Sequence, residues 1–378
     1  MDPVDSVTLT GVVRQALGDH RTEVLTWQRD PIPVPVGSAF TAGLSRVRGT
    51  AESGGRRLPW SAVLKIVHRP PGTTAYDQPG GTPYWRREAC VYESGLLADL
   101  GGGLSAPRCF AVVPQHDETV ALWLEDVTDH HDEGWPLPLY YSVARHLGQF
   151  NGAYLAGRPL PAAPWLATEP LRAWVTSQTG SVDLIDRPGI WSHPLLRQAF
   201  PVAIAGRLRR LWAERETFLE ALRRLPQTFC HFDAGHHNLL PQPADGGSGR
   251  TVALDWECAG IAAVGEEIGL LISSPFIRNA HHPSAIPRIR ELVFEGYLDG
   301  LRDAGWHGPC RDVRLGFAAN AALRFVFRTT GLRDVIDESR QAREEQHWGC
   351  SFETLMEGRA ALTYALLDLV DEARALME

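Results

Sequence analysis

The sequence contains a single lysine, Lys65, although Lys and Arg together number 37. A general preference for arginine would explain why lysine is scarce, but not why an ammonium group is kept in the stretch SAVLKIVHRP. Runs of Lys and Arg long enough to follow a phosphate backbone are also missing, and the formal net charge is −8. Both features argue against nucleic acid as the main partner. The negative charge mildly favours a cationic or neutral ligand.

The sequence also lacks paired cysteines and long apolar runs. Its six cysteines are dispersed and never form a C-x-x-C pair, so we expect buried, reduced thiols rather than a disulfide scaffold or a structural zinc site. No apolar run approaches the roughly 20 residues of a membrane span. The N-terminal stretch MDPVDSVTLTGVVRQALGDH shows no basic region followed by an apolar run. These absences predict a cytoplasmic protein without a membrane partner, and they are compatible with a monomer and with a homodimer.

The composition is that of a folded globular protein, with 44% hydrophobic and 22% charged residues in 378. After a short amphipathic helix over 7–17, alternating apolar residues predict strands in EVLTWQ, LSRVRGT, WSAVLKIV, RCFAVVPQ and TVALWLEDV. The turn-forming ESGGRR joins the second and third strands into a hairpin, with Lys65 near the middle of its second strand. A helix is expected over YWRREACVYESGLLADL, which ends at GGG.

From about residue 139 the pattern becomes mainly helical. Long helices are expected over 139–157, 203–225, 285–305 and 352–376. Two short apolar pieces, FCHFDAGHHNLLP and TVALDWE, interrupt them. The Trp- and Pro-rich segment 158–200 has no clear period and is either a cap over a pocket or a long loop. We therefore expect two domains, a small α+β domain over 1–127 and a helical domain over 128–378.

The residues with the clearest chemistry lie in His231-Phe-Asp-Ala-Gly-His-His-Asn238 and in Leu254-Asp-Trp-Glu257. A carboxylate, Asp233, is followed five residues later by an amide, and a second carboxylate, Asp255, lies on the next strand. This set suits phosphoryl transfer, in which the protein mainly positions groups and neutralises charge. An Asp can orient a hydroxyl and accept its proton, whereas Asn and a second Asp supply hard oxygen ligands to Mg²⁺.

An H-x-D triplet alone would fit a surface loop equally well. Here the motif H-x-D-x-x-x-x-N is joined by a later Asp and is preceded by a strand lysine and a helix glutamate. This order of residues resembles the aminoglycoside phosphotransferase and choline kinase-like family. The resemblance implies an α+β, two-lobed protein-kinase-like fold, with a small β-rich N-terminal lobe that binds the nucleotide and a larger, mainly helical C-terminal lobe.

The resemblance also implies roles for the residues of these motifs. Asp233 would be the catalytic base, and His231 would pack against the catalytic loop and orient it. Asn238 and Asp255 would bind Mg²⁺. The phosphate donor would be ATP, with GTP as an alternative.

Nucleotide-binding residues are implied in the N-terminal lobe. Lys65 would contact the α and β phosphates and be held by Glu88, with Glu93 as the second choice. A phosphate-facing position can exclude arginine, since a compact ammonium differs in reach from a planar guanidinium. The stretch Trp-Leu-Glu125-Asp-Val127 matches the hinge, whose backbone groups read the adenine edge.

The sequence departs from the protein-kinase pattern in two places. The segment VGSAFTAGLSRV lacks G-x-G-x-x-G, so Ser38, Thr41 and Gly43 are candidates for covering the phosphates. The D-F-G triplet is D-W-E here. Where relatives have an Asp soon afterwards, Glu267 is expected to brace the catalytic loop.

The predicted activity is an ATP- and Mg²⁺-dependent transfer of phosphate to a hydroxyl of a small molecule. An aminoglycoside, another antibiotic, a nucleoside, an amino sugar, choline or homoserine all remain open as acceptors, in resistance or in biosynthesis. His236, Glu257 and Arg278 are candidates for binding the acceptor because of their positions. The alternative is a catalytically silent, kinase-like protein that binds nucleotide and regulates. Protein kinase activity is disfavoured because no A-P-E segment follows Asp255.

Overall fold

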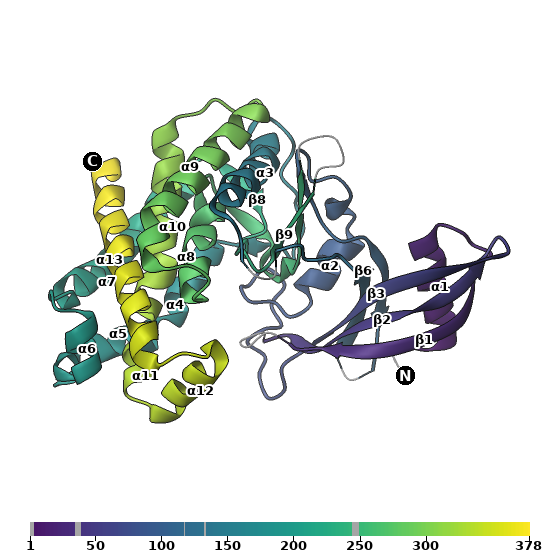
Figure 1. The fold of residues 1–378 in the computed structure, drawn as a ribbon. Coiled ribbons are helices and arrows are strands. Elements are labelled where there is room, and N and C mark those ends of the chain that lie inside the picture. Colours follow the sequence, from purple (N-terminus) through teal and green to yellow (C-terminus); the bar gives the residue numbers. More distant parts are fainter. Residues whose placement is uncertain (1–3, 35–38, 117, 132–133, 244–248) are drawn as a thin grey trace.

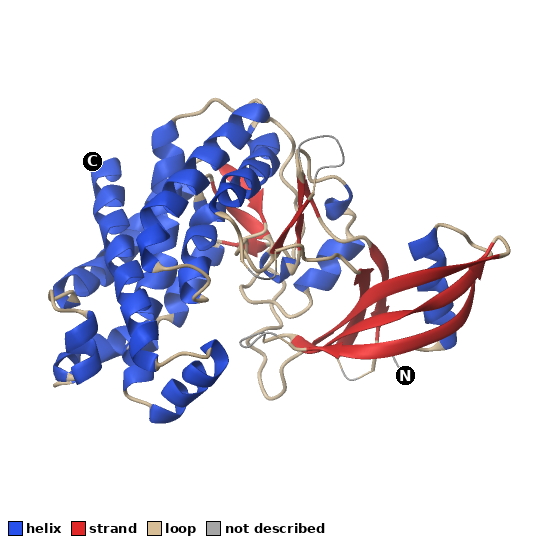
Figure 2. Cartoon of the chain, viewed as in Figure 1, coloured by secondary structure: helices blue, strands red, loops and turns tan. Residues whose placement is uncertain are grey.

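The chain forms two lobes, a β-rich one and a larger helical one, which meet along one side (Figure 1, Figure 2). The computed structural model describes residues 4–34, 39–116, 118–131, 134–243 and 249–378. Within these residues no helix is both long enough and apolar enough to cross a membrane.

The β-rich lobe is built on an antiparallel sheet with the strand order β1-β2-β3-β6-β5. Its strands confirm the sequence prediction and are β1 (Glu23–Ile32), β2 (Thr41–Ser53), β3 (Arg56–His68), β5 (Cys109–Pro114) and β6 (Thr119–Glu125). The predicted first helix is α1 (Ser6–Leu17), which covers one face of the sheet. Because Asp5 accepts hydrogen bonds from two backbone amides of its first turn, the helix begins there.

Strand β3 shows why Lys65 points away from α1. Trp60, Ala62 and Leu64 alternate along the strand and are buried in the cluster that includes α1. Successive side chains of a strand point to opposite faces, so Lys65 lies on the other face. That face is covered by α2 (Arg87–Glu93).

The helix predicted after the Pro- and Gly-rich loop is shorter than expected. It ends at Glu93, because Gly95 adopts φ 75° and only a short 3₁₀ turn, η1 (Leu96–Ala98), follows. The chain then enters β4 (Leu104–Ser105), which pairs with β10 (Arg250–Ala253) of the helical lobe. This pairing links the two lobes directly after α2.

The helical lobe contains the long helices expected from the sequence and others that were not. The predicted ones are α3 (Leu137–Leu155), α7 (Ala205–Arg224), α9 (Ile286–Asp303) and α13 (Phe352–Met377). Those that the sequence did not reveal include α8 (Gly269–Ile277), α10 (Cys310–Thr329), α11 (Leu332–Val335) and α12 (Glu338–Trp348). Helix α10 lies in the centre of the lobe and packs against α8 and α13.

Two small sheets carry the loops of the predicted motifs. One has the order β4-β10-β9, with β9 at Leu239–Gln242. The other has the order β7-β11-β8 and consists of β7 (Ala167–Thr168), β11 (Gly260–Ala263) and β8 (Gln227–Cys230). The loop between β8 and β9 contains the H-x-D motif, so the sheets fix both of its ends.

The segment 158–200 is not a long loop. It folds into β7, the short helices α4 (Pro170–Ser177), α5 (Thr179–Val182) and α6 (Pro194–Ala199), and the 3₁₀ turns η2 (Asp183–Asp186) and η3 (Ile190–Ser192). Apolar residues of these elements are buried in the core of the lobe, among them Leu171, Val175, Ile185 and Leu196.

The cysteines are free but not all buried, which corrects the sequence expectation. Cys230 and Cys258 are buried, whereas Cys310 is exposed and the other three are half-buried. Cys310 opens α10, where its side chain faces outward at the start of an otherwise buried helix.

Candidate active site

Lys65 lies between two carboxylates that come from different lobes. Its Nζ is 2.6 Å from Oε2 of Glu88 on α2 and 2.9 Å from Oδ1 of Asp255 after β10. Burial alone would lower the pKa of Lys65, but the charges of Asp255 and Glu88 outweigh it and raise this pKa above its ordinary value. Glu93, the second choice from the sequence, is exposed at the end of α2 and forms no described ion pair with Lys65.

The carboxylate of Asp233 is held at both oxygens. Nη2 of Arg324 donates to Oδ1 over 3.0 Å, and Nδ2 of Asn238 donates to Oδ2 over 2.8 Å. The same amide of Asn238 donates to the Asp233 carbonyl over 3.0 Å. These contacts fix the orientation of the carboxylate before any substrate is bound.

His231 and Glu267 connect this loop to the rest of the lobe. The ring of His231 donates from Nε2 to the Leu254 carbonyl over 2.7 Å and accepts at Nδ1 from the Asp233 amide over 3.1 Å. Glu267 accepts from the backbone amides of His231 and Phe232, over 2.8 and 3.0 Å. The prediction that Glu267 braces the catalytic loop is confirmed by these two hydrogen bonds.

Two residues of the site have backbone conformations that are costly for a residue with a side chain. Phe232 and Asp255 both adopt φ 62°, and such left-handed residues cost on the order of 1–3 kcal/mol each. The backbone of Phe232 is held in this conformation by two hydrogen bonds. Its N–H donates to Glu267, and its carbonyl accepts from Arg324. The two strained positions are Asp255 itself and the residue directly before Asp233.

Two side-chain oxygen atoms on these loops are of the type that would bind the expected magnesium ion, although the described residues contain no cluster of three or more acidic, His or Cys side chains that could hold a metal. Because the NH₂ group of Asn238 is used by Asp233, its Oδ1 remains without a partner in the described part of the chain. Oδ2 of Asp255 is likewise unused there, while Oδ1 binds Lys65. The Leu254 amide donates to the Asn238 carbonyl over 2.8 Å, which places the two side chains on neighbouring segments. Carboxylate and amide oxygens are the ligands that Mg²⁺ prefers.

The predicted hinge follows strand β6. The amide of Glu125 donates to the Arg108 carbonyl over 2.8 Å, and its side chain accepts from the Arg108 amide over 3.1 Å. The Glu125 amide is therefore not available to adenine, whereas Val127 lies beyond the strand in an irregular segment. Thr41 is the first residue of β2, and Ser38 lies outside the described residues.

The candidates for binding the acceptor lie around the catalytic loop. The amide and Nδ1 of His236 contact Oγ of Ser274 on α8, over 3.1 and 2.9 Å, and burial lowers the pKa of His236 to about 3. Its ring is therefore neutral at pH 7. Glu257 lies in the 3₁₀ turn η4 (Trp256–Cys258), where burial and the charge of Asp255 raise its pKa. Arg278 ends α8, and burial lowers its pKa although Asp233 acts in the opposite direction.

Arg324 and Arg87 are site residues that the sequence did not reveal. The Arg324 side chain is 3% exposed and lies over the Trp174 ring, at 4.6 Å from its centre. Arg87 is fully buried and donates to four backbone carbonyls, those of Trp165, Glu257, Pro79 and Gly81. Neither arginine belongs to a short motif, and no signal in the sequence pointed to either of them.

The sequence matches a known family. Residues 91–308, more than half of the chain, match the family described as "Phosphotransferase enzyme family". The chain belongs to this family. No curated protein sequence matches it significantly.

Solved structures of members and relatives of the phosphotransferase family share the fold. A choline kinase from Cryptosporidium parvum is 13% identical, with 99% of this chain and 100% of that chain covered and a TM-score of 0.56. Amicoumacin kinase in complex with AMP-PNP is 13% identical over 97% and 94% of the two chains, with a TM-score of 0.50. An aminoglycoside phosphotransferase from Alicyclobacillus acidocaldarius is 16% identical over 92% and 93%, also with 0.50. The expected two-lobed, kinase-like fold is confirmed.

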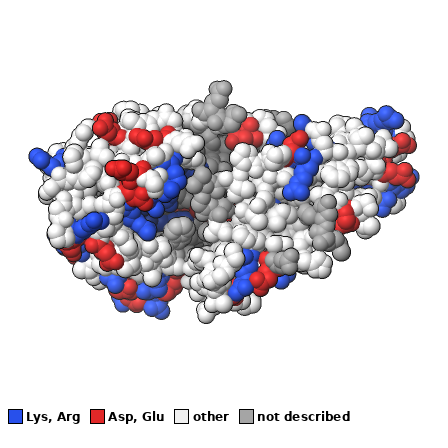
Figure 3. Space-filling model, turned by 90° about the horizontal axis from the view of Figure 1, so that it is seen from below, with Lys and Arg blue, Asp and Glu red and all other residues white. Residues whose placement is uncertain are grey.

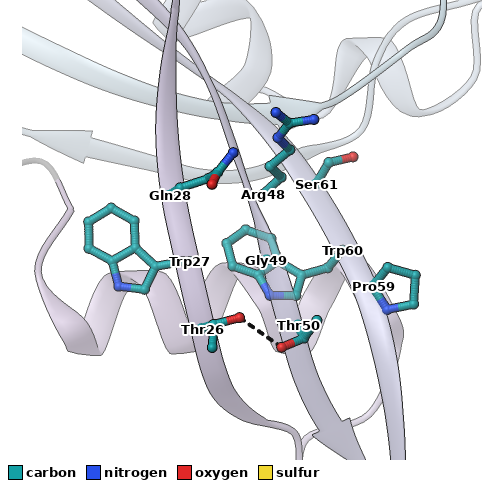
Figure 4. Close-up of a pocket in the computed structure, with 9 residues that line it drawn as sticks. All are labelled: Thr26, Trp27, Gln28, Arg48, Gly49, Thr50, Pro59, Trp60 and Ser61. Atoms are coloured by element: carbon teal, nitrogen blue, oxygen red, sulfur yellow. Dashed lines mark hydrogen bonds between the residues drawn. The ribbon is translucent and has the colours of Figure 1, made fainter.

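A hollow of about 620 Å³ lies away from these residues, on strands β1, β2 and β3 (Figure 4). Trp27, Gly49 and Trp60 lie side by side across it. Strand β1 approaches so closely that a Cβ on Gly49 would be 1.9 Å from the Thr26 carbonyl oxygen. Pro59, at one end, is six residues before Lys65 on β3, which corresponds to roughly 20 Å. None of the predicted site residues lines this hollow.

Proposed function

We propose that this phosphotransferase is a small-molecule kinase that uses ATP and Mg²⁺ and phosphorylates a hydroxyl group. The observation that carries this proposal is the carboxylate of Asp233, which is held at both oxygens, in a chain that also contains the buried Lys65–Glu88 ion pair. A fixed carboxylate at a hydroxyl can orient it and accept its proton. The membership in the family supports the transfer of phosphate.

In the proposed reaction the acceptor hydroxyl gives its proton to Asp233 while its oxygen forms a bond to the γ-phosphorus. The bond between the γ-phosphorus and the β-γ bridging oxygen breaks, and ADP leaves. The ion pair between Lys65 and Asp255 is replaced by contacts between Lys65 and the α and β phosphates, and the ion pair between Lys65 and Glu88 remains. Asn238 and Asp255 would hold Mg²⁺, which neutralises phosphate charge when bound.

Two backbone groups of the predicted hinge suit a nucleotide base. We expect the carbonyl of Glu125 and the amide of Val127 to read adenine, because the Glu125 amide is already bonded to Arg108. The AMP-PNP complex of amicoumacin kinase supports ATP as the donor. Comparing kcat/KM for ATP and GTP with one acceptor tests this choice directly.

We also propose that the lobes divide near residue 127 and that the protein works in the cytoplasm. Strand β6 ends at Glu125 and α3 begins at Leu137, so the division falls in the segment between them. Six free thiols suit a reducing compartment. Limited proteolysis, followed by mass spectrometry of the fragments, should cut first within 126–136.

The deciding experiment replaces the proposed base. Asp233→Ala should lower phosphate transfer by about 10³-fold or more while the Kd for an ATP analogue stays within about threefold, since general-base help and fixed orientation are lost together. A coupled ADP assay over a library of hydroxyl compounds measures transfer, and calorimetry measures binding.

The matched control is Asp183→Ala, which removes an exposed carboxylate of η2. Near wild-type turnover in Asp233→Ala would show that another group is the base. If wild type binds ATP but phosphorylates no compound, the silent regulatory alternative is favoured instead.

A further inference from the structure

Two arginines beside the catalytic loop have no acidic partner in the described part of the chain. These are Arg278 at the end of α8 and Arg328 near the end of α10. Many other arginines of the helical lobe are paired with carboxylates, for example Arg145 with Asp303 and Arg314 with Glu372. Arg290 and Arg333 likewise form no ion pair among the described residues, so Arg278 and Arg328 are distinguished by their position near the catalytic loop.

Both arginines lie one helical turn beyond a residue that contacts the catalytic loop. Arg278 comes four residues after Ser274, whose Oγ binds His236. Arg328 comes four residues after Arg324, which binds Asp233. Residues four apart share a helix face and are about 6 Å apart along the axis. Because α8 packs against α10, Arg278 lies close enough to interact electrostatically with both Asp233 and Arg328.

The electrostatic environment of the two groups agrees with this placement. Burial lowers the pKa of Arg278, the carboxylate of Asp233 raises it, and the charge of Arg328 lowers it. Burial also lowers the pKa of Arg328, although its side chain is exposed to solvent. Basic side chains border the hollow between the lobes in Figure 3.

The acids closest to Arg328 are already used. Asp334 binds Arg340 and Arg359 through its two oxygens, over 2.8 and 2.9 Å. Glu344 binds Arg359 over 2.6 Å. Neither acid forms an ion pair with Arg328, although the charges of both still raise its pKa, as the charge of Asp233 raises that of Arg278. Two partly desolvated like charges destabilise each other unless an anion joins them.

We propose that the acceptor carries an anionic group, a carboxylate or a phosphate monoester, and that Arg278 and Arg328 bind it while its hydroxyl faces Asp233. The proposal rests on the proposed kinase function and names its class of acceptor. Guanidinium groups suit such anions because they offer two parallel donors to two oxygens. The local charge thus opposes the preference for a cationic acceptor that the net charge of −8 indicates.

The test uses acceptors that differ only in the anion. Homoserine is compared with 3-aminopropan-1-ol and carnitine with β-methylcholine for the carboxylate, and glycerol 3-phosphate with glycerol for the phosphate. For at least one pair, wild type should show a kcat/KM at least 100-fold higher for the anionic member. Equal or better use of the neutral and cationic members would overturn the proposal. Transfer to no member of any pair or of the wider library counts against the kinase function itself.

Variants then assign the effect to the two arginines. Arg278→Gln and Arg328→Gln should each lower the ratio of kcat/KM between the anionic and neutral members by roughly 10- to 100-fold, the worth of a lost charged hydrogen bond. The KM for ATP should stay unchanged. Arg333→Gln on α11, an exposed arginine of the same lobe, is the control. An equal loss for both members of a pair would mean that the arginines act on the transferred phosphate, which contradicts the proposal.

Anion binding gives a readout that needs no turnover. Malonate and inorganic phosphate should bind to the AMP-PNP complex of wild type in calorimetry, and at least tenfold more weakly to Arg278→Gln. Absence of anion binding in wild type would overturn the proposal. Anion binding without phosphate transfer would support the anion site and contradict the kinase function.

Discussion

Lys65 is distinguished both by composition, as the single lysine of the chain, and by its geometry in the structure. An ammonium is a compact charge with three donors, and it lies here between Glu88 and Asp255, with 9% of its side chain exposed. A guanidinium is longer and planar and would need more space between the two carboxylates. The position therefore discriminates between the two basic residue types, which a solvated strand position would not do.

This discrimination can be measured with a substitution that keeps the charge. Lys65→Arg should raise the KM for ATP or lower kcat by about tenfold or more, because the larger head group displaces Glu88 or the phosphates. Initial rates at varied ATP concentration provide the measurement.

The matched control for Lys65→Arg is the reverse change at an exposed pair. Arg48 binds Asp30 on the same sheet with more than half of its side chain exposed, so Arg48→Lys should change nothing measurable. If Lys65→Arg behaved like this control, the single lysine would have no special role in binding nucleotide.

At the scale of secondary structure, the sequence predicts elements that have one buried face. The strands of the β-rich lobe and helices α3, α7, α9 and α13 show alternating or helical spacing, because one side of each meets solvent. Helix α10 was not predicted, although it also carries apolar residues at helical spacing, because its polar residues Arg314, Asn320 and Arg324 interrupt the apolar segment. In the fold almost every residue from Val313 to Phe327 is buried, the polar Asn320 and Arg324 included, which spacing alone does not reveal.

The missed helix explains the missed part of the site. Asp233, Asn238, Asp255 and Lys65 belong to recognisable motifs and could be placed from the sequence. Arg324 and Arg328 have no motif, and their relation to Asp233 depends on how α10 packs against the catalytic loop. Such long-range contacts become visible only in three dimensions.

Helix α10 is coupled to the 3₁₀ turn η5 (Glu266–Ile268) by a buried carboxylate. Glu266 accepts from the Ala263 amide and from Nδ2 of Asn320, over 2.8 and 3.1 Å. Burial nevertheless raises its pKa from 4.5 to about 7. The Oδ1 atom of Asn320 has no partner among the described residues, so a protonated Glu266 could donate to Asn320 after its amide rotates.

The raised pKa makes stability depend on pH. Between pH 4.5 and about 7 the folded protein holds the proton of Glu266 more tightly than the unfolded chain does. The free energy of unfolding should therefore fall as pH rises through this window, by about 3 kcal/mol from this group. Glu266→Gln mimics the protonated form. In this variant, the free energy of unfolding measured with urea should therefore fall much less between pH 5 and pH 8 than it does in wild type.

Other buried acids contribute to the pH dependence, so the comparison needs a control. Glu357→Gln removes an exposed carboxylate of α13 and should keep the wild-type dependence. An identical pH dependence in wild type and Glu266→Gln would mean that Glu266 is ionised at little cost in the folded protein.

At the scale of the whole molecule, Arg87 joins the two lobes. It lies next to Glu88 on α2, and its guanidinium bonds to the carbonyls of Trp165 and Glu257 in the helical lobe, over 2.8 and 2.9 Å. It also binds carbonyls of the loop that precedes α2. One buried side chain thus positions α2, and with it the Lys65–Glu88 pair, against the helical lobe.

Removal of this connection should weaken the coupling between the lobes. Arg87→Met keeps an unbranched apolar stem but leaves buried carbonyls without donors, which should lower the free energy of unfolding by about 3 kcal/mol or more. Wild type should unfold in a single thermal transition in calorimetry. In Arg87→Met this transition should broaden or split into two, because the lobes no longer stabilise each other. An ATP analogue, which in the proposed function contacts both lobes, should partly restore a single transition. Arg86→Met, the same change at the preceding, half-buried residue, should leave the midpoint close to wild type. An unchanged single transition in Arg87→Met would show that β4 and the remaining contacts hold the lobes together without this arginine.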